Sequence, residues 1–129
     1  MIEMRAEWTL PWPDVQTNRL WRVGGGRVYL NPKAIAWRDW AIAVIRRSGY
    51  QLPKGRLALS IYEYPPAGWH GDTDGIVKLT QDSIFDALGG NDYWVAEVHA
   101  YRGAPCATPR IEAVLESVRW RTIDEVKAP

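Results

Sequence analysis

Hydrophobic and polar positions alternate in several stretches of the chain, and this period of two predicts strands. Residues 6–12 alternate until the prolines at positions 11 and 13, and residues 56–64 alternate until Pro65. Residues 93–101 predict a third strand. Residues 110–120 fit a helix or a strand on pattern alone, and we favour a strand because several of their apolar residues are β-branched.

Two other stretches carry apolar residues at helical spacing and have clear end signals. Residues 32–48 follow Asn31, which suits the N-cap, and a proline at the first helical position; Gly49 ends the stretch. Residues 75–88 follow Asp74, which also suits an N-cap, and a Gly-Gly pair ends them. The sequence therefore predicts two helices of ordinary length.

Residues 21–30 carry three consecutive glycines at their centre and predict a hairpin. A glycine-rich phosphate cradle is the alternative. It is the weaker interpretation, because no Lys-Ser/Thr pair follows the glycines and no helix starts directly after them.

The predicted order is strand, hairpin, helix, strand, helix, strand, strand. This order predicts an α+β fold, in which a small mixed sheet has two helices packed on it. The 129 residues are expected to form one domain over residues 1–129, with a frayed polar tail at about residues 122–129.

Composition narrows the class of protein. The net charge of +1 excludes a grossly basic DNA-coating protein, although residues 1–64 hold ten Lys/Arg against five Asp/Glu and residues 65–129 hold six against ten. This asymmetry suits a basic shelf beside an acidic metal pocket, and a chance clustering of surface charge explains it almost as well.

Cys106 is the only cysteine, which excludes an internal disulfide and indicates a reducing, cytoplasmic setting. No apolar run approaches the roughly 20 residues that span a bilayer, so no membrane association is expected.

Eight tryptophans are spread over the whole chain, which is many for this length. Most are expected in the core or in a subunit interface. The sharper alternative is that one or two present a stacking face to nucleic acid or to a partner.

Acidic residues gather around the start of the second predicted helix. Asp72, Asp74 and Asp82 surround Lys78, and Asp92 follows the Gly-Gly pair, where the chain can fold back toward the helix start. Carboxylate oxygens are the ligands that Mg²⁺ and Mn²⁺ prefer, so this group indicates phosphodiester chemistry. The alternative is a solvent-facing helix with ion pairs four residues apart.

The same residues resemble the RusA family of Holliday-junction resolvases. That family opens with a strand that ends in a segment close to Leu10-Pro-Trp-Pro13, and the segment Tyr29-Leu-Asn-Pro-Lys-Ala34 resembles its first helix start. Its central signature, Asp-x-Asp-Asn-x-x-Lys-x-x-x-Asp followed by an Asp-Asp pair, reads here as residues 72–82 and 91–92. This chain departs from it at Gly75, at Asn91 and at His70-Gly71. The likeness covers most of residues 7–118.

The resemblance implies a homodimeric, Mg²⁺-dependent endonuclease that cuts two opposed strands of a four-way DNA junction, with Mn²⁺ able to replace Mg²⁺. Asp72, Asp74 and Asp92 would hold the metal, and Asp82 would be a supporting carboxylate. Lys78 would contact the scissile phosphate. The setting implied by analogy is a bacterial or phage-infected cell.

Other basic residues are candidates for contacts with DNA. His70 lies two residues before Asp72 and could contact phosphate. Four cations near the hairpin and the first helix start are the best candidates for further phosphate contacts, although surface charge explains them equally well: Arg19, Arg22, Arg27 and Lys33.

Two rival functions remain at the level of sequence. One is a non-catalytic DNA-binding or assembly protein on the same scaffold, and the other is a branched-DNA nuclease with broader flap and fork specificity. A nucleophilic triad is not predicted, because the serines lack a supporting motif and Cys106 has no obvious basic partner.

Overall fold

The computed structural model describes residues 4–13, 21–24, 27–71 and 73–129, with the backbone alone for residues 21–24 and 27–30. Its elements run in the order β1 (Arg5–Pro11), β2 (Trp21–Gly24), β3 (Arg27–Leu30), α1 (Pro32–Arg47), β4 (Arg56–Tyr64), α2 (Thr73–Leu88), a 3₁₀ turn η2 (Asp92–Trp94), β5 (Val95–Arg102), β6 (Arg110–Val118) and α3 (Ile123–Lys127).

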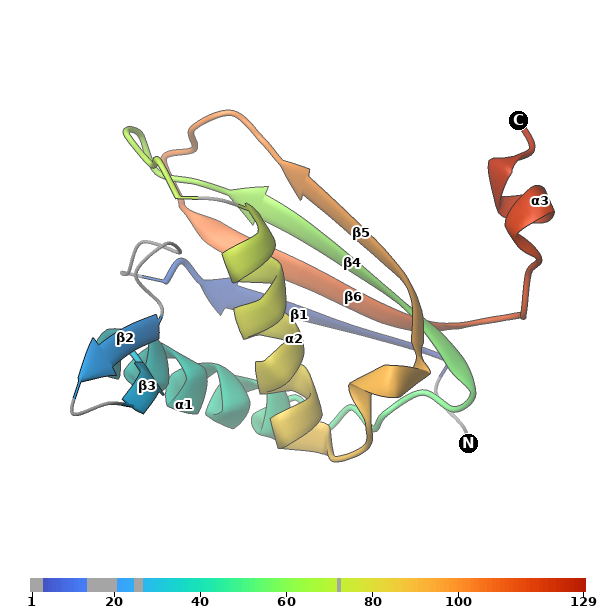
Figure 1. Ribbon diagram of the computed structural model, residues 1–129, viewed down its shortest axis with the longest axis horizontal. Helices are drawn as coiled ribbons and strands as arrows, with labels where there is room; N and C mark the ends of the chain where they lie inside the picture. Colours follow the sequence, from blue (N-terminus) through green and yellow to red (C-terminus); the bar gives the residue numbers. More distant parts are fainter. Residues whose placement is uncertain (1–3, 14–20, 25–26, 72) are drawn as a thin grey trace.

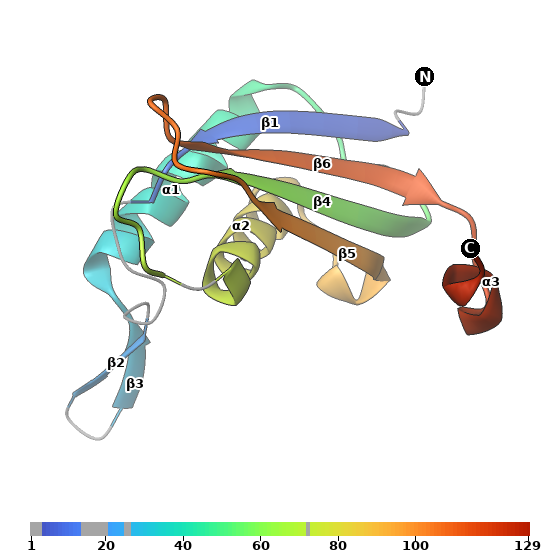
Figure 2. The same cartoon turned by 90° about the horizontal axis from the view of Figure 1, so that it is seen from above.

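Four of the strands form one mixed sheet in the order β1-β6-β4-β5. The last of these strands in sequence, β6, lies inside the sheet and runs antiparallel to both β1 and β4. β5 pairs parallel with β4. Because a parallel pair needs a crossover, α2 lies between these two strands in the chain and spans the sheet. β2 and β3 form a separate antiparallel hairpin, which projects from the domain (Figure 2).

Both long helices cover the same face of the sheet, as Figures 1 and 2 show. Alternate residues of β1 and β6 are buried beneath them, whereas the edge strand β5 has no buried residue. The core joins this face to the apolar sides of both helices, and its largest members include Leu10, Ile45, Leu59, Ile61, Ile76, Ile84, Ile111 and Leu115.

Side-chain hydrogen bonds hold α1 in place at both of its ends. Near the start, the indole Nε1 of Trp37 donates to the carbonyl of Pro11 at 2.9 Å. At the other end, the indole Nε1 of Trp8 donates to Ser48 Oγ at 2.9 Å. The guanidinium of Arg46 donates to the carbonyls of Ala87 and Asp86, which the last turn of α2 leaves without helical partners. The two helices are therefore tied together where α2 ends.

The α+β prediction is confirmed, and so are the hairpin at residues 21–30 and the choice of a strand after residue 110. The first helix runs as predicted, with the Asn31 side chain accepting from the backbone N–H of Lys33.

Three details of the prediction are wrong. The second helix begins at Thr73, so Asp74 lies in its first turn and is not the N-cap. β5 begins at Val95, because residues 92–94 first make a 3₁₀ turn. The tail is not frayed throughout, because residues 123–127 form α3, whose start is closed by a reciprocal capping box between Thr122 and Glu125.

None of the helices in the described ranges is both long enough and apolar enough to cross a membrane.

Candidate functional site

One side of α2 carries a stripe of polar residues. A helix turns about 100° per residue, so Asp74, Lys78, Gln81 and Asp82 fall within about a third of its circumference. We call these four residues the α2 stripe. Asp74 and Lys78 are exposed, whereas the opposite side of α2 buries Ile76, Leu79, Thr80, Ser83 and Ile84. The amphipathic sequence of α2 therefore turns the stripe toward solvent.

Two contacts organise this stripe. Lys78 Nζ lies 3.2 Å from Asp82 Oδ2, one turn further along the helix. Gln81 Nε2 donates to Asp92 Oδ2 at 3.4 Å. The second contact brings an acid from outside the helix to the same face as Asp74 and Lys78.

The turn after α2 explains how Asp92 reaches that face. Gly89 and Gly90 have φ values of +78° and +98°, which reverse the chain at the end of the helix. The Asn91 side chain then accepts a hydrogen bond from the backbone N–H of Tyr93 and starts the 3₁₀ turn that contains Asp92. Asn91 thus caps the 3₁₀ turn. In the RusA signature described above, the first aspartate of the Asp-Asp pair stands at this position.

The structure does not gather the predicted metal ligands that it describes into one group. Asp72 lies outside the described residues. Asp74 and Asp82 are separated by eight residues, about 12 Å along the helix axis. Within the described ranges, no three His, Cys, Asp or Glu side chains come together closely enough to hold a metal ion. Asp92 is held against the stripe by Gln81, a residue that was not predicted but whose spacing of seven from Asp74 places it on the same face.

The predicted DNA-contacting residues are only partly described. Arg19 lies outside the described residues, and for Arg22 and Arg27 the structure gives only backbone positions in β2 and β3. Lys33 is exposed in the first turn of α1, and His70 is exposed three residues before α2 begins.

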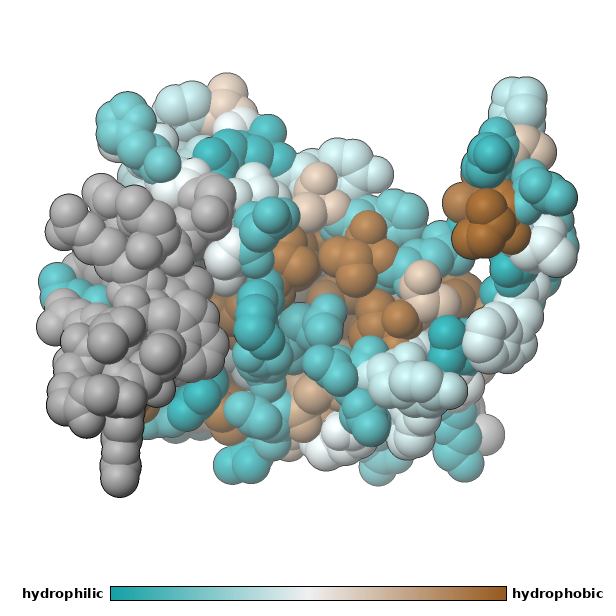
Figure 3. Space-filling view, viewed as in Figure 1, coloured by the Kyte–Doolittle hydropathy of each residue, from teal (hydrophilic) through white to brown (hydrophobic). Residues whose placement is uncertain are grey.

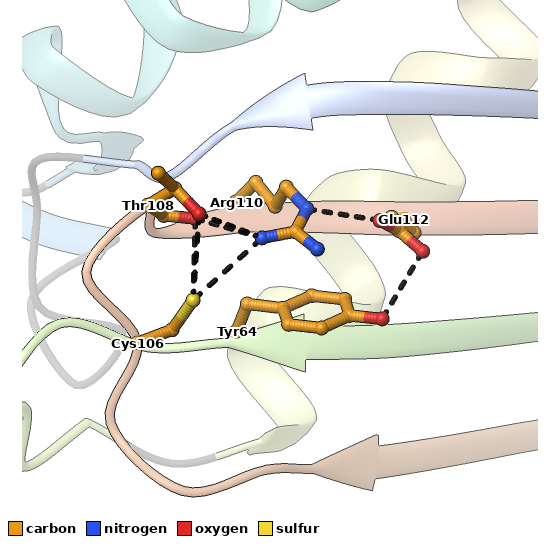
Figure 4. Close-up of polar contacts among 5 residues, drawn as sticks. All are labelled: Tyr64, Cys106, Thr108, Arg110 and Glu112. Carbon is orange, nitrogen blue, oxygen red and sulfur yellow. Dashed lines mark hydrogen bonds and ion pairs between the residues drawn. The ribbon is translucent and has the colours of Figure 1, made fainter.

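A second polar cluster lies on β4, β6 and the loop before β6 (Figure 4). Arg110 donates to Glu112 at 2.9 Å and to the sulfur of Cys106 at 3.7 Å, and it lies 3.8 Å above the ring of Tyr64. Hydrogen bonds with Thr108, and then with Arg110, lower the pKa of the Cys106 thiol. Arg110 is thus a cationic neighbour of Cys106, but it is not a general base, because its guanidinium stays protonated. The guanidinium of Arg110 is already engaged by Glu112, Thr108 and Tyr64, which is typical of a structural ion pair.

Taken together, the described residues define an α+β domain that presents carboxylates and a lysine on one exposed helix face. A protein-family model described as endodeoxyribonuclease RusA matches residues 11–116. The chain belongs to this family and is an enzyme of the endodeoxyribonuclease class. No curated protein matches the chain. The matched residues include the α2 stripe and Asp92, whereas α3 lies beyond them.

Proposed function

We propose that the protein is a Mg²⁺-dependent endonuclease that resolves four-way DNA junctions by paired symmetric nicks and acts as a homodimer. The family acts on branched DNA, which supports the substrate. The observation that carries the proposal is the α2 stripe: Asp74 and Lys78 share one exposed helix face, and Gln81 holds Asp92 to it.

The donor set fits Mg²⁺ or Mn²⁺. Mg²⁺ is usually bound by one or two carboxylates together with water and substrate phosphate. Asp74 is exposed and lies in the first turn of α2, where the helix dipole favours an anion. In this proposal Asp72, Asp74 and Asp92 hold the ion. The bound ion would supply charge neutralisation at the phosphate and an activated water.

Lys78 acts on the phosphate in this proposal. Its ammonium group is exposed and pairs with Asp82, which keeps the cation on the stripe side of α2 before DNA binds. A scissile phosphate that approached Asp74 would compete with Asp82 for this cation. The positive charge then stabilises the negative charge that develops as the phosphodiester bond breaks.

An uncovered apolar surface supports the homodimer. β5 is an edge strand, and its Val98 side chain is 48% exposed on the face that the helices cover elsewhere. Trp94 and Tyr93 are exposed in the turn just before this strand. Figure 3 shows hydrophobic residues, in brown, between α2 and α3. Exposed apolar surface of this kind is typical of protein interfaces, and a two-fold dimer would present two sites to a nearly two-fold junction.

The test is nicking of a labelled synthetic four-way junction with Mg²⁺, with Ca²⁺ and with EDTA. The unmutated protein should cut only with Mg²⁺ or Mn²⁺, at two opposed strands. Asp74→Asn and Lys78→Ala should still bind the junction in Ca²⁺ but lose cutting by about 100-fold or more, since the first removes a proposed metal ligand and the second a stabilising positive charge. Asp86→Asn is the matched control, because Asp86 is an exposed aspartate of α2 outside the stripe.

Unchanged cutting by both stripe variants would remove the proposal. The absence of any Mg²⁺-dependent cleavage by the unmutated protein would favour the non-catalytic DNA-binding alternative. Equal cleavage of four-way junctions, flaps and forks would favour the broader branched-DNA nuclease. Sedimentation analysis of the free protein tests the homodimer separately.

A further inference from the structure

The tryptophans whose side chains the structure describes range from buried to exposed, and three of them share one groove. The groove has a volume of about 270 Å³ and is lined by Trp12, Lys33, Ala36, Trp37 and Trp40. Trp37 is only 5% exposed and its indole nitrogen is hydrogen-bonded to Pro11, so this ring is structural. Trp40, by contrast, is 56% exposed.

Burial in the core does not account for Trp40. It lies on α1, one turn after Trp37, and more than half of its surface faces solvent. Among the residues that the structure describes, no aromatic ring stacks on it and no cation covers it. An exposed indole beside a cavity is an available stacking platform.

The groove adjoins the segment that leads into the α2 stripe. Trp12 meets Trp69 edge to face, with ring centroids 5.1 Å apart. Trp69 directly precedes His70 and lies four residues before the start of α2. One aromatic contact therefore connects the wall of the groove to the chain that carries the candidate catalytic acids.

The charge around the groove favours a negatively charged ligand. Lys33 lies on its wall and is exposed. The first turn of α1 contains no acidic residue, so the positive end of its dipole is not neutralised there. The described wall thus combines aromatic rings with a cation, which are the two features that bind unpaired nucleic acid.

We propose that this groove binds one unpaired nucleotide of the DNA substrate, with its base stacked on Trp40 and its phosphate beside Lys33. The volume suits a single base, since it is below the roughly 300–1,000 Å³ of pockets for drug-sized ligands. The inference rests on the proposed function for the presence of branched DNA. Taking a base out of its stack costs least where the base is already unpaired, so substrates that carry unpaired nucleotides should fill the groove best.

The experiment measures binding in EDTA, so that cutting does not enter the result. The probes are a fluorescently labelled 12-residue oligothymidylate, a four-way junction and a linear duplex. Trp40→Ala should weaken binding of the oligothymidylate by about tenfold or more, the range for loss of one base–aromatic stack. Trp40→Phe should restore most of the affinity because it keeps a ring. Trp120→Ala is the matched control, since Trp120 is 69% exposed and lies on the C-terminal segment, outside the groove.

A second variant separates the phosphate contact from the stacking contact. Lys33→Gln should weaken oligothymidylate and junction binding and lower the salt dependence by about one phosphate contact. It replaces an exposed side chain, so the fold is retained, and circular dichroism checks this for every variant.

The outcomes distinguish this inference from the proposed function. Loss of oligothymidylate binding in Trp40→Ala, in a protein that cuts no junction, would support the groove and remove the nuclease mechanism. Unchanged binding of both oligothymidylate and junction by Trp40→Ala, in a protein that cuts junctions, would overturn the groove alone. An equal loss in Trp120→Ala would also overturn it.

Discussion

At the scale of single residues, the side chain of Gln81 joins Asp92 to α2 through a hydrogen bond. Asp92 comes from a turn after α2, and nothing in that turn alone requires its carboxylate to face the stripe. The amide of Gln81 supplies a donor at that position. Residues that orient metal-binding carboxylates commonly affect metal affinity as strongly as a weak ligand does. We therefore treat Gln81 as a positioning residue.

On the metal-dependent mechanism proposed above, replacing this glutamine should weaken catalysis by weakening metal binding. Gln81→Leu removes the donor and should raise the Mg²⁺ concentration needed for half-maximal cutting by about tenfold or more. Gln81→Glu should raise this Mg²⁺ concentration further, because two carboxylates would then face each other. Gln51→Leu is the control, at an exposed loop glutamine. If Gln81→Leu and the unmutated protein needed equal Mg²⁺ concentrations for half-maximal cutting, Asp92 would need no support from Gln81.

The polar spacing of α2 could be predicted from the sequence because helical periodicity alone places Asp74, Lys78 and Asp82 on one side. The Gln81–Asp92 contact could not, since it depends on where the chain returns after α2. The aromatic groove could not be predicted from the sequence either. The sequence pattern does not distinguish Trp12, Trp37 and Trp40 from the other tryptophans.

At the scale of elements, the turn between α2 and η2 controls where β5 begins. Gly90 has φ +98°, and a Cβ built on it would lie 2.6 Å from Leu52 Cδ2 and 3.3 Å from the ring of Trp94. Gly89 has φ +78° but would meet no atom within 4 Å. The first glycine is therefore required for its backbone conformation, and the second for both conformation and space.

These two glycines should respond differently to the same substitution. Gly89→Ala should lower the free energy of unfolding by about 1–2 kcal/mol, the cost of a left-handed backbone for a residue with a side chain. Gly90→Ala should cost more than this, because Leu52 or Trp94 must also move. Urea denaturation of the two variants measures the difference. Equal losses would show that Leu52 adjusts freely.

Boundaries were harder to predict than the elements themselves. The glycines, prolines and caps marked every turn between the predicted elements, and the two long helices end where these signals stand. The start of α2 was misplaced because Asp72 and Asp74 are both acceptable near a helix start, and spacing does not choose between them. α3 was missed because five polar-rich residues give too short a pattern to detect.

At the scale of the whole molecule, the C-terminal segment joins the body through a few exposed contacts. Arg121 pairs with Glu97, the ring of Trp120 stacks on Arg56 at 3.8 Å, and Arg119 pairs with Glu125 at 2.9 Å. Beyond Arg121 the chain projects away from the sheet as α3 (Figure 1). This part of the chain is therefore expected to matter little for the stability of the domain.

Truncation tests that expectation. Ending the chain after Arg121 removes α3 and one surface ion pair, and should change the free energy of unfolding by less than about 1 kcal/mol. Ending it after Glu116 also removes the last β6 residues and the Arg56–Trp120 contact, and should cost about 2 kcal/mol or more. Thermal denaturation and junction cutting measure both variants. A large loss of stability in the variant that ends after Arg121 would show that α3 packs against the domain in solution.

The position of β6 has a consequence for how the protein is made. Of the four strands in the described sheet, β6 leaves the ribosome last, yet it separates β1 from β4 in the finished sheet. Until residue 118 has emerged, the two earlier strands have no neighbour in common and the nascent chain cannot close its sheet. Pairings between residues far apart in the sequence, such as Arg5 and Glu116, are slow to form. The sheet can therefore close only after residue 118 has emerged, and until then the unpaired edges of β1 and β4 are exposed to aggregation.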